Sequence, residues 1–190
     1  LIDEQTLLVQ NRSNSVIRIA LDKGEVDITT FHTSFPSTDL LVDSLHQIWI
    51  STAGDGLHCF SPDGTPLHHY TTANSGLNDN HQQSLTQCKG HLLIGTRNGG
   101  LNILKLATGN IWQMKHVPGD GQFTVPGNNI NRLYTDRYDN VLMGIVDHGL
   151  VSLRAVFLRS YTSLYAGFGK GPLGNSITCF FPQGDYVWIG

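Results

Sequence analysis

The feature that most constrains this chain is a short pattern that recurs five times along its 190 residues. The clearest copies, at 48–52, 92–96 and 141–144, consist of bulky apolar residues followed by a small residue or a threonine. The residues that occupy the same place in the five copies are Leu8, Trp49, Leu93, Leu142 and Trp188. Their spacings of 41, 44, 49 and 46 residues indicate a protein built from repeated units of similar size.

Each repeat carries the pattern of four short strands. In the third clear copy, the predicted strands are 130–135, 141–145, 150–153 and 157–161. In the first clear copy, Asp63-Gly64 predicts a hairpin turn before the last strand. One such antiparallel meander cannot bury both of its faces, whereas meanders stacked face to face around an axis can. We therefore expect an all-β fold, a β-propeller, of which this chain is an arc of about four four-stranded blades.

The blades are expected to form one partial propeller domain over 1–190, within an intact propeller of seven blades. Their approximate bounds are 1–35, 36–80, 81–125, 126–172 and an incomplete 173–190. The chain begins without methionine and stops inside a predicted strand, so we expect a longer protein. The open ends of the arc would need the remaining blades or a second copy.

Gly56, Gly100 and Gly149 stand at the same place in the three clear copies, directly before an apolar strand residue. A positive φ or a close backbone approach is expected there, because only glycine adopts both at little cost. The bulky residues at the centre of each pattern, such as Trp49, are expected to pack between neighbouring sheets.

Composition limits the class of function. Charged residues make up 14% of the chain, the net charge is −3, and no long basic run exists, so nucleic-acid binding is not expected. No segment approaches the ~20 apolar residues of a membrane span, so membrane attachment would need segments outside this chain. Cys59, Cys88 and Cys179 lie in apolar runs, and their odd number favours buried free thiols over a disulfide framework.

The recurring residues resemble the two-component regulator propeller repeat. The segment 93–102, Leu-Ile-Gly-Thr-Arg-Asn-Gly-Gly-Leu-Asn, is the closest match. The segments 75–80, 126–131 and 173–177 are similar to the family's Ser-Leu-Ser-Asn-Asn-x-Ile lead-in. The resemblance spans essentially the whole chain, although the copy at 7–31 lacks Trp-Ile-Gly-Thr and the third clear copy lacks the Thr-Gly hairpin.

This resemblance implies the periplasmic sensor region of a hybrid histidine kinase of the Bacteroides type, an inner-membrane protein. It implies that an oligosaccharide or another small ligand binds the propeller, and that the intact sensor is a homodimer that signals to its kinase. The fragment itself is then not an enzyme, even though the intact protein would carry a kinase. No cofactor is expected.

The ligand is expected on the face of the propeller where two loops of each blade meet: the loop that leads into the first strand of the blade, and the loop that follows its second strand. Amide, carboxylate and guanidinium groups suit sugar hydroxyls, although Asn and Asp also serve turn geometry. Asp55 lies in such a loop of the first clear copy. The candidate ligand-binding residues are Asn78, Asn80, His81, Arg97, Asn98, Asn128, Asn129, Asp147, His148 and Asn175.

Neither a metal site nor a catalytic site is expected. His68 and His69 are neighbours on a predicted strand and so point to opposite faces, and the other histidines, His58 among them, are scattered. Two alternatives to the sensor stay open: a propeller scaffold that binds another protein, and a carbohydrate-active enzyme of propeller fold. A tight protein partner would favour the scaffold, and turnover of a glycan would favour the enzyme.

Overall fold

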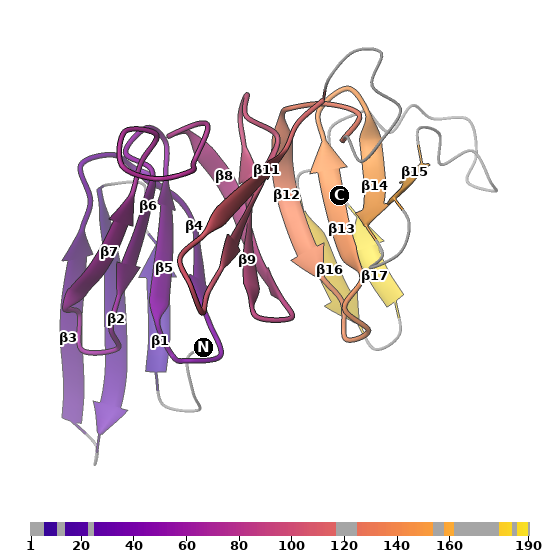
Figure 1. The fold of residues 1–190 in the computed structure, drawn as a ribbon. Coiled ribbons are helices and arrows are strands. Elements are labelled where there is room, and N and C mark those ends of the chain that lie inside the picture. Colours follow the sequence, from indigo (N-terminus) through magenta and orange to yellow (C-terminus); the bar gives the residue numbers. More distant parts are fainter. Residues whose placement is uncertain are drawn as a thin grey trace. The chain divides into compact units, whose positions relative to one another are not determined.

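The computed structural model describes residues 6–10, 14–22, 25–116, 125–153, 158–161, 179–183 and 186–189. Within these ranges the chain forms strands and turns without a helix, and every strand pairing is antiparallel (Figure 1). The all-β class predicted from the repeats is confirmed. The strands belong to two compact units, Leu1–Gln82 and Gln83–Gly190.

The first unit contains two sheets. The three-stranded sheet consists, in order, of β1 (Thr6–Gln10), β2 (Ser15–Asp22) and β3 (Glu25–His32). The four-stranded sheet consists, in order, of β4 (Ser37–Val42), β5 (Ile48–Thr52), β6 (Leu57–Phe60) and β7 (Pro66–Tyr70). Since consecutive strands are always neighbours, each sheet is a simple meander.

The two sheets of the first unit pack face to face. Their shared core consists of Val16, Phe31, Ile48, Ile50 and Phe60. The rings of Phe31 and Phe60 meet edge to face, with their centroids 5.1 Å apart. Burial of each such side chain stabilises the unit by about 1.5–3 kcal/mol. β5 is buried along its whole length, which explains why the repeated pattern is apolar without alternation.

The second unit contains two four-stranded meanders and one strand pair. The first meander consists of β8 (Gln82–Cys88), β9 (His91–Thr96), β10 (Leu101–Lys105) and β11 (Ile111–Met114). The second consists of β12 (Ile130–Thr135), β13 (Val141–Ile145), β14 (Gly149–Leu153) and β15 (Leu158–Tyr161). The pair consists of β16 (Phe180–Gln183) and β17 (Tyr186–Ile189).

The two meanders of the second unit are joined by apolar and polar contacts. Their common core consists of Leu93, Leu101, Val125, Ile130, Leu133, Val141, Met143, Ile145 and Val151. The Ser84 hydroxyl on β8 accepts a hydrogen bond from the Leu133 N–H on β12 at 3.0 Å. Thr86 and Thr135 join the same two strands through their hydroxyls, 2.9 Å apart. Four-stranded meanders stacked in this way are the blades of a β-propeller. The predicted blade bounds and the total of seven stay predictions.

The turn between the first and second strands is built in the same way in two blades. Asp43 Oδ1 accepts hydrogen bonds from the N–H groups of Leu45 and Gln47, at 2.8 and 2.9 Å. Asp136 Oδ1 accepts the equivalent two bonds, both at 2.8 Å. Asp43 Oδ2 also accepts the indole N–H of Trp49 at 2.9 Å. The aspartate at this place is therefore a turn residue in both blades, and Asp43 also anchors a core side chain.

A glycine at the start of each third strand, or directly before it, closes the loop that follows the second strand. The φ angles of Gly56, Gly100 and Gly149 are +76°, +75° and +71°, so the predicted positive φ is confirmed at all three. The Gly56 carbonyl accepts hydrogen bonds from the N–H and hydroxyl of Thr52, at 3.2 and 2.8 Å. The Gly100 carbonyl accepts the same two bonds from Thr96, at 3.1 and 2.9 Å. The threonine of the repeated pattern therefore fixes the loop backbone.

The three cysteines are free, but they are not all buried. Cys59 on β6 has no exposed surface, and burial, with a smaller contribution from Asp43, raises the pKa of its thiol to about 12. Cys88 is partly exposed, and burial again raises its pKa. Cys179 is exposed, so the prediction of burial is wrong there. It directly precedes β16, whose residues Phe181–Gln183 are themselves exposed.

Candidate functional site

In the first unit, the segment that leads toward β8 lies against the loop that follows β5. Gly56 in this loop donates its N–H to the carbonyl of Asn80 at 3.1 Å. Ala53, in the same loop, forms an antiparallel bridge with His81. The two kinds of loop predicted to share a face are therefore neighbours in this unit.

The asparagines Asn80 and Asn128 occupy equivalent places and make equivalent contacts. Asn80 Oδ1 accepts the N–H of Thr72 at 2.8 Å, and Asn128 Oδ1 accepts the N–H of His116 at 2.7 Å. The carbonyl of Asn128 accepts the N–H of Gly100 at 2.9 Å, as that of Asn80 accepts the N–H of Gly56. Each asparagine thus connects the segment that follows a blade to the loop after the second strand of that blade. This structural role accounts for the recurrence of the asparagine without a contact to a ligand.

Two of the remaining candidates near β13, Asn129 and His148, are also engaged within the fold. Asn129 Oδ1 accepts a hydrogen bond from Gln83 Nε2 at 3.1 Å, and its carbonyl accepts the N–H of Val146 at 2.9 Å. His148 Nδ1 lies 2.9 Å from the carbonyl of Val146. Asp147, between these two residues, is exposed and has a positive φ of 64°. Of this group, Asp147 presents its side chain most openly to solvent.

Arg97 and Asn98 are exposed in the loop between β9 and β10. Among the residues that the structure describes, the Arg97 side chain has no hydrogen-bond or ion-pair partner. Asn78 and His81 are partly buried in the first unit. Asn175 lies outside the described residues.

The candidates thus fall into two groups, one in each unit. In the second unit, the segment 126–129 contacts the 97–100 loop through Gly100 and the 146–149 loop through Val146. The six candidates Arg97, Asn98, Asn128, Asn129, Asp147 and His148 therefore lie on three adjoining segments. Asn78, Asn80 and His81 form the corresponding group of the first unit.

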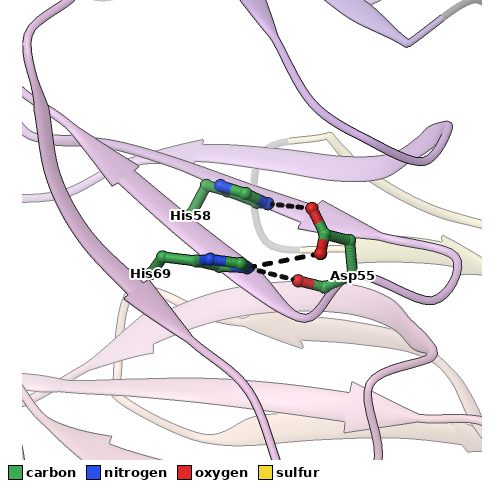
Figure 2. Close-up of side chains that lie close together, drawn as sticks. All are labelled: Asp55, His58 and His69. Atoms are coloured by element: carbon green, nitrogen blue, oxygen red, sulfur yellow. Dashed lines mark hydrogen bonds and ion pairs between the residues drawn. The ribbon is translucent and has the colours of Figure 1, made fainter. Parts of the chain in front are cut away.

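A cluster that the sequence analysis did not predict lies in the first unit, at one end of the β6–β7 hairpin (Figure 2). His58 on β6 and His69 on β7 are direct cross-strand partners, and their rings stack with centroids 4.1 Å apart and planes 14° apart. Both Nε2 atoms face Asp55 in the preceding loop. His58 Nε2 lies 3.0 Å from Asp55 Oδ2, and His69 Nε2 lies 3.6 Å from Asp55 Oδ1.

Hydrogen bonds to neighbouring groups hold the cluster in place, and all three side chains remain partly exposed to solvent. The Asp55 N–H donates to the Thr52 hydroxyl at 2.9 Å, and His69 Nε2 lies 2.7 Å from the Asp55 carbonyl. The exposed fractions of the side chains are 14% for His58, 19% for Asp55 and 42% for His69. Burial and then the neighbouring His69 lower the pKa of His58, against the smaller opposing effect of Asp55. Two imidazoles and one carboxylate, all reachable from water, therefore converge within 4.8 Å.

The sequence contained a signal for this cluster. A hairpin that turns near Asp63-Gly64 brings residues close to 58 and 69 opposite each other, and the observed register, which shifts between Cys59 and Phe60, pairs these two directly. Adjacent residues do not reveal the cluster, because His68 and His69 point to opposite faces of the sheet. Only the pairing of β6 with β7 brings His58 and His69 together. The expected absence of a metal site stays a prediction.

No family model and no curated protein matches the chain. Solved structures do resemble it. It is similar to the extracellular domain of BT4673 from Bacteroides thetaiotaomicron, described as a hybrid two-component system, with a TM-score of 0.71, 16% identity, 99% of this chain covered and 27% of that one. The corresponding domain of BT3049 from the same organism gives a TM-score of 0.65, 16% identity, 99% of this chain and 27% of that one.

A computationally designed protein, Ika8, is also similar, with a TM-score of 0.65, 12% identity, 99% of this chain covered and 53% of that one. At these identities the likeness concerns the fold alone, as the presence of a designed protein among the neighbours illustrates. The resemblance predicted from the repeats is confirmed at this level. The chain has the fold of extracellular domains of Bacteroides two-component systems, and it spans 27% of the length of those domains.

Proposed function

We propose that this chain is part of an extracytoplasmic sensor of a two-component regulator, that it binds oligosaccharides, and that the intact protein signals to a histidine kinase. The observation that carries the proposal is the structural likeness over 99% of the chain to extracellular domains of hybrid two-component systems. None of the described segments forms a helix with the length and apolar character that crossing a bilayer requires.

The arrangement of the second unit supports a binding site on its adjoining loops. Arg97 and Asp147 are exposed on the loops that follow the second strands of two stacked blades. A guanidinium group offers several donors and a carboxylate offers acceptors, which is the pairing that sugar hydroxyls require. By contrast, the side-chain oxygens of Asn128 and Asn129 are engaged within the fold. We therefore assign the first contacts with the ligand to Arg97 and Asp147.

Binding of oligosaccharides to purified protein and to two arginine variants tests the proposal. Isothermal titration with a panel of glucan, xylan, mannan and pectin oligosaccharides should identify at least one ligand. Arg97→Ala should then weaken its affinity by about tenfold, as expected for the loss of a charged hydrogen bond.

Arg137→Ala is the matched control. Arg137 is also exposed and also belongs to the second unit, but it lies in the turn between β12 and β13, at the other end of the meander from the 146–149 loop. Its replacement should leave affinity unchanged. Absence of binding to every oligosaccharide, or equal losses in the two variants, would remove the support for this site.

In the intact protein, the sensor would act by favouring one arrangement of two copies over another when ligand binds. The pairing of copies and the link to a kinase are part of the proposal, and they rest on the family resemblance. Crosslinking of the intact protein in membranes, with and without the identified oligosaccharide, tests them. An unchanged crosslinking pattern would contradict this mode of signalling.

A further inference from the structure

We propose that Asp55, His58 and His69 form a binding site for a divalent transition-metal ion such as Zn²⁺. The site goes beyond the proposed sensor function and does not depend on it. It rests on the convergence of three ligand types, from two strands and one loop, at one end of the β6–β7 hairpin (Figure 2).

The distances suit a small coordination sphere. Zn²⁺ holds nitrogen and oxygen ligands at about 2.0–2.2 Å, so two ligand atoms of a tetrahedral site lie about 3.3–3.5 Å apart. The carboxylate oxygens of Asp55 lie 3.0 Å from His58 Nε2 and 3.6 Å from His69 Nε2. These two separations bracket the required value, and all the ligand atoms lie within 4.8 Å of one another. Because the two rings are stacked with planes only 14° apart, they must tilt toward each other to place both nitrogens on one ion.

The backbone positions these ligands before an ion arrives. His58 and His69 are paired across two hydrogen-bonded strands, so their side chains point to the same face of the sheet. Asp55 is fixed by its N–H bond to the Thr52 hydroxyl, within the loop that the Gly56 carbonyl closes. A preformed arrangement reduces the ordering entropy that binding would otherwise cost. To bind the ion, His69 Nε2 must release to solvent the proton that it donates to the Asp55 carbonyl at 2.7 Å, so this hydrogen bond breaks in the metal-bound form.

The ligand set also predicts which ions bind. Two imidazole nitrogens and one carboxylate favour Zn²⁺, Co²⁺, Ni²⁺ or Cu²⁺, whereas Ca²⁺ and Mg²⁺ prefer shells made of oxygen. Three protein ligands leave a position for water, which the partial exposure of His69 allows. Zn²⁺ and Co²⁺ should therefore bind, and Ca²⁺ should not.

Titration of chelator-treated protein with Zn²⁺ alone, followed by calorimetry, tests the site. We expect one ion per chain, and the His69→Asn variant should bind about 100-fold more weakly or worse, since even indirect supports of metal ligands contribute 10–100-fold. Substitution with Co²⁺ provides a second readout, because imidazole ligation in a four-coordinate site gives strong visible absorption. That absorption should appear in the wild type and disappear in His69→Asn.

The control variant is His68→Asn, on the same strand but facing the other side of the sheet. It should retain Zn²⁺ affinity and the Co²⁺ spectrum. Circular dichroism of each variant verifies the fold, and Asp55→Asn, which nearly preserves the shape of the side chain, serves where a histidine variant unfolds. Failure of the wild type to bind Zn²⁺, or equal losses in His68→Asn and His69→Asn, would overturn the proposal.

Discussion

Replacement of Gly100 by alanine tests whether the repeated glycine is needed for the blade backbone. Gly100 has a φ of +75°, and a Cβ placed on it would lie 2.5 Å from the carbonyl oxygen of Met114. The same Cβ would lie 3.2 Å from Asn128 Oδ1. Ordinary contacts begin at 3.4 Å, so the main-chain oxygen of the neighbouring strand would have to move.

Two costs add at this position. A side chain in the left-handed region costs about 1–2 kcal/mol. Overpacking against atoms that cannot move freely costs about 1–3 kcal/mol more. Gly100→Ala should therefore lower the free energy of unfolding by about 2–5 kcal/mol, which for a chain of this size lowers Tm by on the order of 10 °C.

Gly90→Ala separates the two costs. Gly90 lies in the same unit and has the same φ of +75°, but nothing lies within 4 Å of the position that its Cβ would take. It should lose only about 1–2 kcal/mol, the conformational part. Urea denaturation of both variants, followed by circular dichroism, measures the difference. A loss in Gly100→Ala no larger than that in Gly90→Ala would refute the assignment of Gly100 to close backbone packing.

Three further predictions concern polar groups. Asn128→Ala should lower the free energy of unfolding by about 0.5–2 kcal/mol in urea denaturation, because the His116 N–H loses its acceptor; no loss would argue against this structural role. Iodoacetamide at pH 8, followed by mass spectrometry, should modify Cys179 first and Cys59 last, since Cys59 is buried with a pKa of about 12; rapid modification of Cys59 in folded protein would contradict its burial. In chelator-treated protein, the lowered pKa of His58 means that the unfolded state binds more protons than the folded state below about pH 6.5, so the free energy of unfolding should fall as the pH falls through that value. His58→Asn should show a smaller pH dependence of this free energy in urea titrations. An unchanged pH dependence in the variant would contradict the assignment.

The sequence predicted the strands of the three clear copies because the same apolar pattern recurs in each of them. The faint copy at the start of the chain differs from the prediction, because its described residues form a three-stranded sheet and not a four-stranded one. β5, β9 and β13 are apolar runs that become buried between sheets, and such a run has the same composition wherever it recurs. The positive φ at Gly56 and Gly100 was predictable for the same reason, since one backbone geometry is used in each copy.

The site was less predictable, because the same residue types serve turns and ligands. Asn80 and Asn128 look like binding residues in the sequence, yet their side-chain oxygens bind backbone N–H groups within the fold. Conversely, His58 and His69 look unrelated until the hairpin register pairs them. The repeated pattern along the chain therefore predicts the strands of each blade well, whereas contacts between side chains on different strands can be predicted only once the strand register is known.

The most direct test of the sensor proposal is hydrogen–deuterium exchange of the chain with and without the oligosaccharide that binds it. The proposal predicts slower exchange at 97–100 and 146–149, the loops that carry Arg97 and Asp147, and no change at 136–140, the turn at the other end of the β12–β15 meander. Protection confined to 136–140, or no protection in any loop at saturating oligosaccharide, would contradict the proposed binding face.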